Sequence, residues 1–348
     1  MFKDNIIAEL KQKINNDPDN IDNYKNLANY YIGCDDLNNA ASVYEEILRK
    51  NEDDFQSLIN LGSIYFFKKM YLEAIDCYNK SAQIEPDNYA TYYNLANVYA
   101  EIENFENALA NYKKALEINP DKPDTYSALG YLYSDIGNYQ KAIEYYNKAI
   151  VLEGDNPENY ISIANIKQKL NDPKDALSYY EKAYNLNSKD SKACLCLANM
   201  YAELKDFQKA QEFYEKTIEL APDYYSAWVC RAIAYSDEGK TQDVIPLLKQ
   251  AIEINPDKPN AYILLANILI DEKRYEEGIA VYKTAQKILH NDAKISTFIA
   301  NAYVMLKNYT QAVKYYKKAM KQAPRDNEIK LIYLEMINAY IERKSKKE

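Results

Sequence analysis

Residues 89–122 read YATYYNLANVYAEIENFENALANYKKALEINPDK, and this 34-residue pattern recurs with unchanged phase along most of the chain. Its eighth position, Ala96, belongs to a first small column in which nine consecutive units carry Ala or Gly. The column consists of Ala28, Gly62, Ala96, Gly130, Ala164, Ala198, Ala232, Ala266 and Ala300. A fixed period of this length indicates a repeat array rather than separate globular domains.

A second small column follows twelve residues after the first, and Tyr stands four residues later again in eight of the nine units. The second column consists of Ala40, Ala74, Ala108, Ala142, Ala176, Ala210, Val244, Gly278 and Ala312. Small residues allow two helices to cross closely while large neighbours fill the space beside the crossing. Each unit is therefore predicted to be two amphipathic helices, as over 90–102 and 106–119, and the fold class to be all-α. Of the 36 Tyr, 20 fall in three other columns of the repeat. We expect these 20 to pack in the core, because large side chains that recur at helical spacing usually do.

The pattern resembles the tetratricopeptide repeat (TPR), in which Leu-Gly/Ala, Tyr, Ala, an aromatic residue, Ala and a closing Pro follow at these spacings. The closing residues here are Pro86, Pro120, Pro222, Pro256 and Pro324. The resemblance implies a right-handed superhelix, an α-solenoid of antiparallel helix pairs. Its first helices are expected to line a concave groove and its second helices to form the outer wall.

The repeat frame predicts three parts. Residues 1–20 form an N-terminal capping helix, 21–326 hold nine TPR repeats, and 327–348 form a C-terminal capping helix with a basic tail. The repeats are 21–54, 55–88, 89–122, 123–156, 157–190, 191–224, 225–258, 259–292 and 293–326. In the last helix we expect Leu331, Leu334, Ile337 and Ile341 to face inward.

Composition excludes several functional classes. The 348 residues carry a net charge of -9, which disfavours nucleic acid and anionic lipid as partners. No run of about 20 apolar residues occurs, and the opening segment has Lys3, Asp4 and Glu9 where a signal peptide is apolar. The expected location is therefore cytoplasmic, with no membrane partner.

The sequence offers little chemistry for catalysis. It has one histidine, His290, and no phosphate-binding loop, dinucleotide glycine motif or HExxH. Cys194 and Cys196 point to different faces of one helix and cannot share a metal, while Cys196 and Cys230 lie on helices about 8–10 Å apart, too far for a disulfide. We expect a non-enzyme with no cofactor and no metal site.

The concave face of the first helices is the candidate binding surface. The peptide-binding residues predicted there are Lys25, Asn26, Asn29, Asn60, Phe66, Tyr93, Asn94, Asn97 and Tyr131. An Asn side chain pairs with both the N–H and the C=O of a peptide backbone, so a row of them holds an extended chain. Asn also recurs at Asn165, Asn199, Asn267 and Asn301 as an ordinary feature of the family, and this alternative stays open.

One TPR subfamily binds acidic chaperone tails with a two-carboxylate clamp. The clamp uses residues of three successive first helices, and Lys25, Asn29 and Asn60 match those of its first two helices. Its third helix is basic at the two positions where this chain has Ala90 and Asn94. Carboxylate capture depends on those cations. No clamp is expected here.

The groove changes character along the chain. Its middle collects carboxylates, which favour a basic partner unless they are merely solvated helix ends. These are Glu101, Asp124, Asp135, Glu158, Glu203 and Asp237, against Lys169 and Lys192. Toward the C-terminus the same positions form an apolar groove strip, Leu195, Val229, Ile233, Ile263, Leu264 and Phe298. The strip predicts a binding patch, or a surface that closes on itself or forms a homodimer.

Repeat seven is irregular, with Arg231 in a Leu position and Pro246 in the second helix. Either the superhelix bends locally, with Arg231 bonded to a neighbouring carboxylate, or the repeat is degenerate and without function. The leading functional hypothesis is a non-enzymatic scaffold that binds a peptide segment of a protein partner, with Asn60, Asn94 and Asn97 as backbone grips. The alternatives are a self-associating array and an accessory subunit that recruits substrates to a separate enzyme such as a glycosyltransferase.

Overall fold

The computed structural model describes residues 2–154, 156–290 and 292–345, without the side chains of residue 2 and residues 339–345. The described part consists of twenty helices and contains no strand, so the all-α prediction is confirmed. The helices are α1 Phe2–Asn16, α2 Ile21–Gly33, α3 Leu37–Lys50, α4 Phe55–Phe67, α5 Tyr71–Ile84, α6 Tyr89–Glu101, α7 Phe105–Ile118, α8 Pro123–Asp135, α9 Tyr139–Leu152, α10 Pro157–Lys169, α11 Pro173–Leu186, α12 Ser191–Glu203, α13 Phe207–Leu220, α14 Tyr225–Glu238, α15 Thr241–Ile254, α16 Pro259–Asp271, α17 Tyr275–Leu289, α18 Ala293–Met305, α19 Tyr309–Gln322 and α20 Asn327–Ser345.

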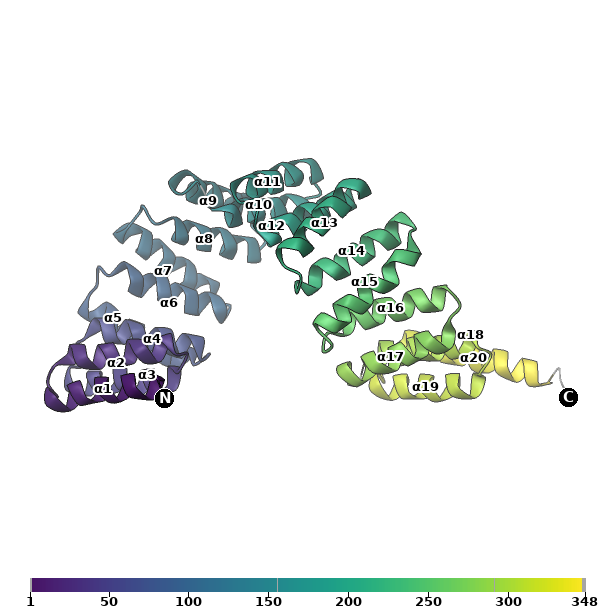
Figure 1. Cartoon of the computed structure of the whole chain (residues 1–348), viewed down its shortest axis with the longest axis horizontal. Helices are drawn as coiled ribbons and strands as arrows, with labels where there is room; N and C mark the ends of the chain where they lie inside the picture. Colours follow the sequence, from purple (N-terminus) through teal and green to yellow (C-terminus); the bar gives the residue numbers. More distant parts are fainter. Residues whose placement is uncertain (1, 155, 291, 346–348) are drawn as a thin grey trace. The chain divides into compact units, whose positions relative to one another are not determined.

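The chain divides into two compact units, unit 1 over Met1–Asn171 and unit 2 over Asp172–Glu348. Unit 1 contains α1 to α10, and unit 2 contains α11 to α20. Within each unit, every helix packs against the next one along the chain, and the two helices of a repeat lie side by side in opposite directions (Figure 1). This order is that of a solenoid built from helix pairs.

The two small columns lie at the helix crossings, as predicted. Ala96 and Ala108, the small residues of α6 and α7, are both fully buried. At Gly130 an added Cβ would lie 2.8 Å from the ring of Tyr146, which is itself buried. The eight Tyr of the second helices are all 0–4% exposed, so the packing role predicted for this column is confirmed.

The turn between the two helices of each repeat has one backbone conformation. The residue fifteen positions into the repeat has positive φ in all nine units. These residues are Asp35, Lys69, Glu103, Gly137, Asn171, Lys205, Gly239, Lys273 and Lys307. In six of the nine units the side chain of the next residue caps the second helix, as where the Asn104 side chain accepts from the backbone N–H of Asn107. The turn therefore fixes the direction of both helices with three residues, or with two in repeat seven.

The C-terminal helix α20 faces the array differently from the prediction. Leu331 and Leu334 are 58% and 55% exposed, so their predicted inward orientation is wrong. Ile329 and Met336 are buried instead, and Ile337 packs against the last core cluster as predicted. The covered stripe of α20 is the one that shares a core cluster with residues of α18 and α19, and it includes Met336 rather than Leu331 and Leu334. The side chain of Ile341 lies outside the described residues.

Repeat seven keeps its helix pair despite Arg231 and Pro246. The Arg231 guanidinium donates to the carboxylate of Glu215 and, at 3.0 Å, to the side-chain oxygen of Gln211. Pro246 lies within α15, and the helix nevertheless runs from Thr241 to Ile254. The bond to a neighbouring carboxylate that the first alternative expects of Arg231 is therefore present.

Candidate peptide-binding site

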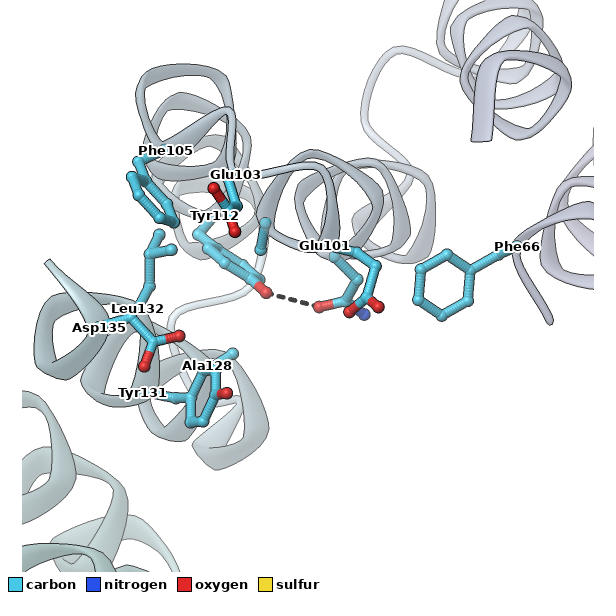
Figure 2. A pocket seen from close by; sticks show the side chains of 11 residues that line it. Phe66, Glu101, Glu103, Phe105, Tyr112, Ala128, Tyr131, Leu132 and Asp135 are labelled. Carbon is cyan, nitrogen blue, oxygen red and sulfur yellow. Dashed lines mark hydrogen bonds between the residues drawn. The ribbon is translucent and has the colours of Figure 1, made fainter. Parts of the chain in front are cut away.

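A hollow of about 680 Å³ opens on the first helices of repeats three and four, within unit 1. We call it the acidic hollow. Phe66 from α4 forms one wall, Glu101 from α6 and Asp135 from α8 line the space, and Tyr131 stands at its side (Figure 2). The turn residue Glu103 adds a third carboxylate.

Helix geometry brings these side chains together. Asn97 and Glu101 are four residues apart on α6, so they lie one turn apart on the same face. Tyr131 and Asp135 are related in the same way on α8. Because the repeat period is 34 residues, Asp135 occupies on α8 the position that Glu101 occupies on α6. Two neighbouring first helices therefore turn matching carboxylates into one hollow.

The floor of the hollow is held by tyrosine hydroxyls. The Tyr112 hydroxyl donates to Asn97 Oδ1 at 2.6 Å, the bond drawn in Figure 2. The Tyr71 hydroxyl donates to Glu101 Oε1 at 3.4 Å. Burial raises the pKa of Tyr112, so this hydroxyl keeps its proton. The side chains under the hollow are thereby positioned before anything binds.

The potential in the acidic hollow is negative. Its three carboxylates, Glu101, Glu103 and Asp135, all belong to exposed residues, and no Lys or Arg is among its described lining residues. Tyr131 is 62% exposed, and its pKa is raised first by the charge of Asp135 and then by burial. An exposed aromatic ring beside carboxylates is a surface suited to a cation.

A second, smaller hollow of about 370 Å³ lies in unit 2, which we call the C-terminal hollow. Each of its lining residues stands 102 residues, three repeats, after a lining residue of the acidic hollow. Glu203 and Asp237 correspond to Glu101 and Asp135, but Lys205 replaces Glu103. Ile233 replaces Tyr131, and Cys230 replaces Ala128.

The residues predicted on the first two repeats make internal bonds. Lys25 Nζ lies 2.8 Å from Asp54 Oδ2 in an ion pair. Burial alone would raise the pKa of Asp54, but the hydrogen bonds from Lys25 and Ser57 outweigh it and lower that pKa. The Tyr44 hydroxyl donates to Asn29 Oδ1 and accepts from Asn60 Nδ2, both at 3.0 Å. The bond between Asn60 and Tyr44 thus joins repeats one and two, whereas the bonds of Lys25 and Asn29 lie within repeat one.

Of the nine predicted groove residues, the hollow brings together Phe66, Asn97 and Tyr131. Tyr93 stacks on Tyr89 with ring centroids 5.7 Å apart. The half-buried Asn94 and the exposed Asn26 lie outside the hollow lining. Sequence reasoning missed the contributions of Glu103, Phe105 and Tyr112. The signal for Tyr112 was present in the Asn and Tyr columns, which pair an Asn with a Tyr fifteen residues later in six of the nine repeats.

The apolar groove strip is only partly exposed. Leu195 and Val229 are buried, at 7% and 9% exposure. Ile263 and Leu264 are half-buried and pack against two core clusters of unit 2. Ile233 and Phe298 are 41% and 37% exposed. The strip therefore presents two separate apolar side chains rather than a continuous band.

Other chemistry is sparse in the described part of the chain. Its residues include no group of three or more His, Cys, Asp and Glu side chains arranged to hold a metal ion. Cys230 carries a free thiol. None of the helices described is long and apolar enough to cross a bilayer.

Helix pairs repeating every 34 residues, with small residues at both crossings and one turn conformation throughout, define an α-solenoid of helix–turn–helix repeats. The family model described as Tetratricopeptide repeat matches residues 53–119 and 87–150, and the one described as Cilia and flagella-associated protein 70 C-terminal domain matches residues 151–348. The chain belongs to the TPR family, and over residues 151–348 to that C-terminal domain family.

Solved structures show the same fold. A TPR protein from Parabacteroides merdae is similar with a TM-score of 0.55 at 18% identity, over 74% of this chain and 98% of its own. The Cut9-Hcn1 hetero-tetramer of APC/C gives 0.52 at 16% identity, over 90% and 63%. Pseudomonas aeruginosa pilF gives 0.51 at 18% identity, over 61% and 97%. At these identities the likeness concerns the fold alone. No curated protein matches the sequence.

Proposed function

We propose that this chain is a non-enzymatic interaction scaffold that binds an extended peptide segment of a partner protein on the first helices of unit 1. TPR folds in general mediate protein–protein interaction. The observation that carries the proposal is the acidic hollow, whose lining includes Tyr131, a large ring left 62% exposed. Core packing does not need this ring, because the ring of Tyr146 already fills the helix crossing against the neighbouring Gly130.

The structure changes which residues we propose as grips. Asn97 and Asn60, expected to grip a backbone, hold tyrosine hydroxyls of their own chain. Asn94 remains a proposed backbone grip next to the hollow. Phe66, Tyr131 and the carboxylates of the hollow supply the rest of the surface. This assignment follows the general rule that a few exposed anchors carry most of the binding energy of an interface.

Site-specific photo-crosslinking tests the proposal. A photoreactive phenylalanine replaces Tyr131 in one variant and Gln140, an exposed residue of α9, in a control variant. After irradiation in the native lysate, the proposal predicts cross-links from position 131 to one short segment of another protein and none from position 140. Cross-links from position 131 only to other copies of this chain would favour the self-associating array. Equal cross-linking from both positions would contradict a peptide-binding face.

A further inference from the structure

The acidic hollow combines two kinds of wall that attract the same chemical group. Glu101, Glu103 and Asp135 offer carboxylate oxygens, and Phe66 and Tyr131 offer aromatic faces (Figure 2). A carboxylate binds a cation through charge-assisted hydrogen bonds, and an aromatic face attracts the same cation through its quadrupole. The described lining contributes no positive charge of its own.

We infer that the acidic hollow binds an arginine side chain of the partner segment, an assignment that rests on the proposed function and sharpens it. Arginine fits better than lysine because its planar guanidinium can stack on a ring while its forked N–H groups reach carboxylates on two sides. Glu101 on α6 and Asp135 on α8 supply carboxylates from two neighbouring helices. Tyr131, one turn before Asp135, supplies the ring.

The size and rigidity of the hollow suit such an anchor. A volume of about 680 Å³ lies within the usual range for ligand pockets, roughly 300–1,000 Å³, and leaves room for an arginine with part of its backbone. The 2.6 Å bond from Tyr112 to Asn97 fixes the side chains beneath the bound group. A site ordered in advance loses less conformational entropy when it binds.

The C-terminal hollow provides a contrast within the same molecule. It keeps carboxylates at Glu203 and Asp237, but Lys205 brings a positive charge and Ile233 removes the ring. Its charge and its walls are therefore less suited to arginine. We expect arginine binding to belong to the acidic hollow and not to its counterpart.

The test is selection of a random twelve-residue peptide library displayed on phage against the full chain. Three baits are compared: the wild type, the pair Glu101→Gln and Asp135→Asn, and a control pair, Glu106→Gln and Asp87→Asn. The control removes the same charge at two exposed residues outside the hollow lining. Circular dichroism checks that all three are helical. We expect arginine to be enriched at one position with the wild type and the control, and not with the hollow variant.

A selected peptide is then synthesised with arginine, lysine or citrulline at the enriched position. Citrulline keeps the shape of arginine but carries no charge. Fluorescence anisotropy should show about tenfold or greater weakening with citrulline, since a charge-assisted bond is lost, and a smaller loss with lysine. Citrulline binding as tightly as arginine would overturn the inference.

The selection also separates the two proposals. Peptides that are enriched without a basic residue, or equally on the hollow variant, would overturn the arginine assignment while leaving peptide binding intact. If no peptide is enriched on any bait, both the proposed function and the inference fail.

Discussion

The acidic hollow and the C-terminal hollow are built from the same positions of the repeat, yet they differ in charge and in size. Both place a Tyr–Asn hydrogen bond beneath two carboxylates, with Tyr112 and Asn97 in one and Tyr214 and Asn199 in the other. The volumes are about 680 and 370 Å³. We call the positions of Glu103 and Tyr131, which Lys205 and Ile233 occupy in unit 2, the rim. Because the backbone pattern is shared, the substitution at the first of these positions accounts for the difference in charge.

The comparison teaches that the repeat separates positions that fold from positions that bind. The small residues and second-helix tyrosines vary little, since each is buried against a neighbouring helix. The rim positions vary freely: Glu103 becomes Lys205, and Tyr131 becomes Ile233. A change at the rim should alter binding, and a change at the crossing should alter stability.

The largest expected effect is on stability, at the crossing under the acidic hollow. Gly130→Leu places a side chain where even a Cβ would lie 2.8 Å from the buried Tyr146 ring. Overpacking at such a position costs about 3 kcal/mol. Urea denaturation measures the loss, and hydrogen exchange should localise it to α8 and α9, because repeats are coupled mainly to their neighbours.

A change at the corresponding position of unit 2 should cost less stability. Ala232, the counterpart of Gly130, shares a core cluster with Leu248, and Ala232→Gly should cost about 1 kcal/mol through helix propensity. If Gly130→Leu lowered the hydrogen-exchange protection of α12 to α15 as much as that of α8 and α9, coupling between neighbouring repeats would not explain stability in this chain.

The next effect, about 2 kcal/mol in binding free energy, comes from exchanging the rims. Glu103→Lys with Tyr131→Ile gives the acidic hollow the rim of its counterpart. It should weaken the arginine peptide roughly 30-fold, since a charge is reversed and an aromatic face is lost. The reciprocal Lys205→Glu with Ile233→Tyr should create arginine binding in unit 2. Unchanged affinity in the first exchange would show that the rim does not set specificity.

The sequence was sufficient for the fold because every folding position is repeated nine times. The small columns and the tyrosine columns give the same answer in most of the nine repeats, so a single irregular unit does not mislead. The helix α20 has no such repetition, and there the inward face of Leu331 and Leu334 was wrongly predicted. Helical period alone does not say which stripe a neighbouring helix covers.

The site was harder to predict because its residues act in pairs. Asn29 and Asn97 look like peptide ligands when their column is taken alone, but each accepts a hydroxyl hydrogen bond from Tyr44 or Tyr112. The pairing can be recognised only by comparing two columns. In repeat seven both members are apolar, Ile233 and Leu248.

This pairing gives a third prediction of about 1 kcal/mol. Tyr112→Phe leaves Asn97 Oδ1 without its hydroxyl donor and should destabilise unit 1 by about that amount. The double variant Asn97→Ile with Tyr112→Leu copies the apolar pair of repeat seven. A double-mutant cycle by urea denaturation compares it with the single variants Asn97→Ile and Tyr112→Leu. The double variant should lose less free energy of unfolding than the two single variants lose in total. Simple additivity would mean that the hydrogen bond does not couple the two residues.

The smallest expected effect is a pH dependence present in one hollow and absent from the other. Cys230 lines the C-terminal hollow where the acidic hollow has Ala128. Burial raises the pKa of the Cys230 thiol, although a hydrogen bond with Asn199 acts in the opposite direction. The folded chain therefore keeps this proton at pH values where the unfolded chain, with an ordinary thiol pKa of about 8.5, releases it.

The sign of this effect follows from that difference. The contribution of the Cys230 thiol to stability is fully present below about pH 8.5 and is lost as the pH rises through the folded pKa. Cys230→Ala should remove this part of the pH dependence, and Ala128 shows that the same position elsewhere in the chain accepts alanine. Urea denaturation at pH 7.5 and pH 9.5 compares the two chains, and the other thiols and tyrosines cancel because both chains contain them. The wild type should lose more stability than the variant between these pH values. Equal losses would mean that the thiol is as well solvated in the hollow as in the unfolded chain, and the two hollows would then differ only in the charges and rings at their rims.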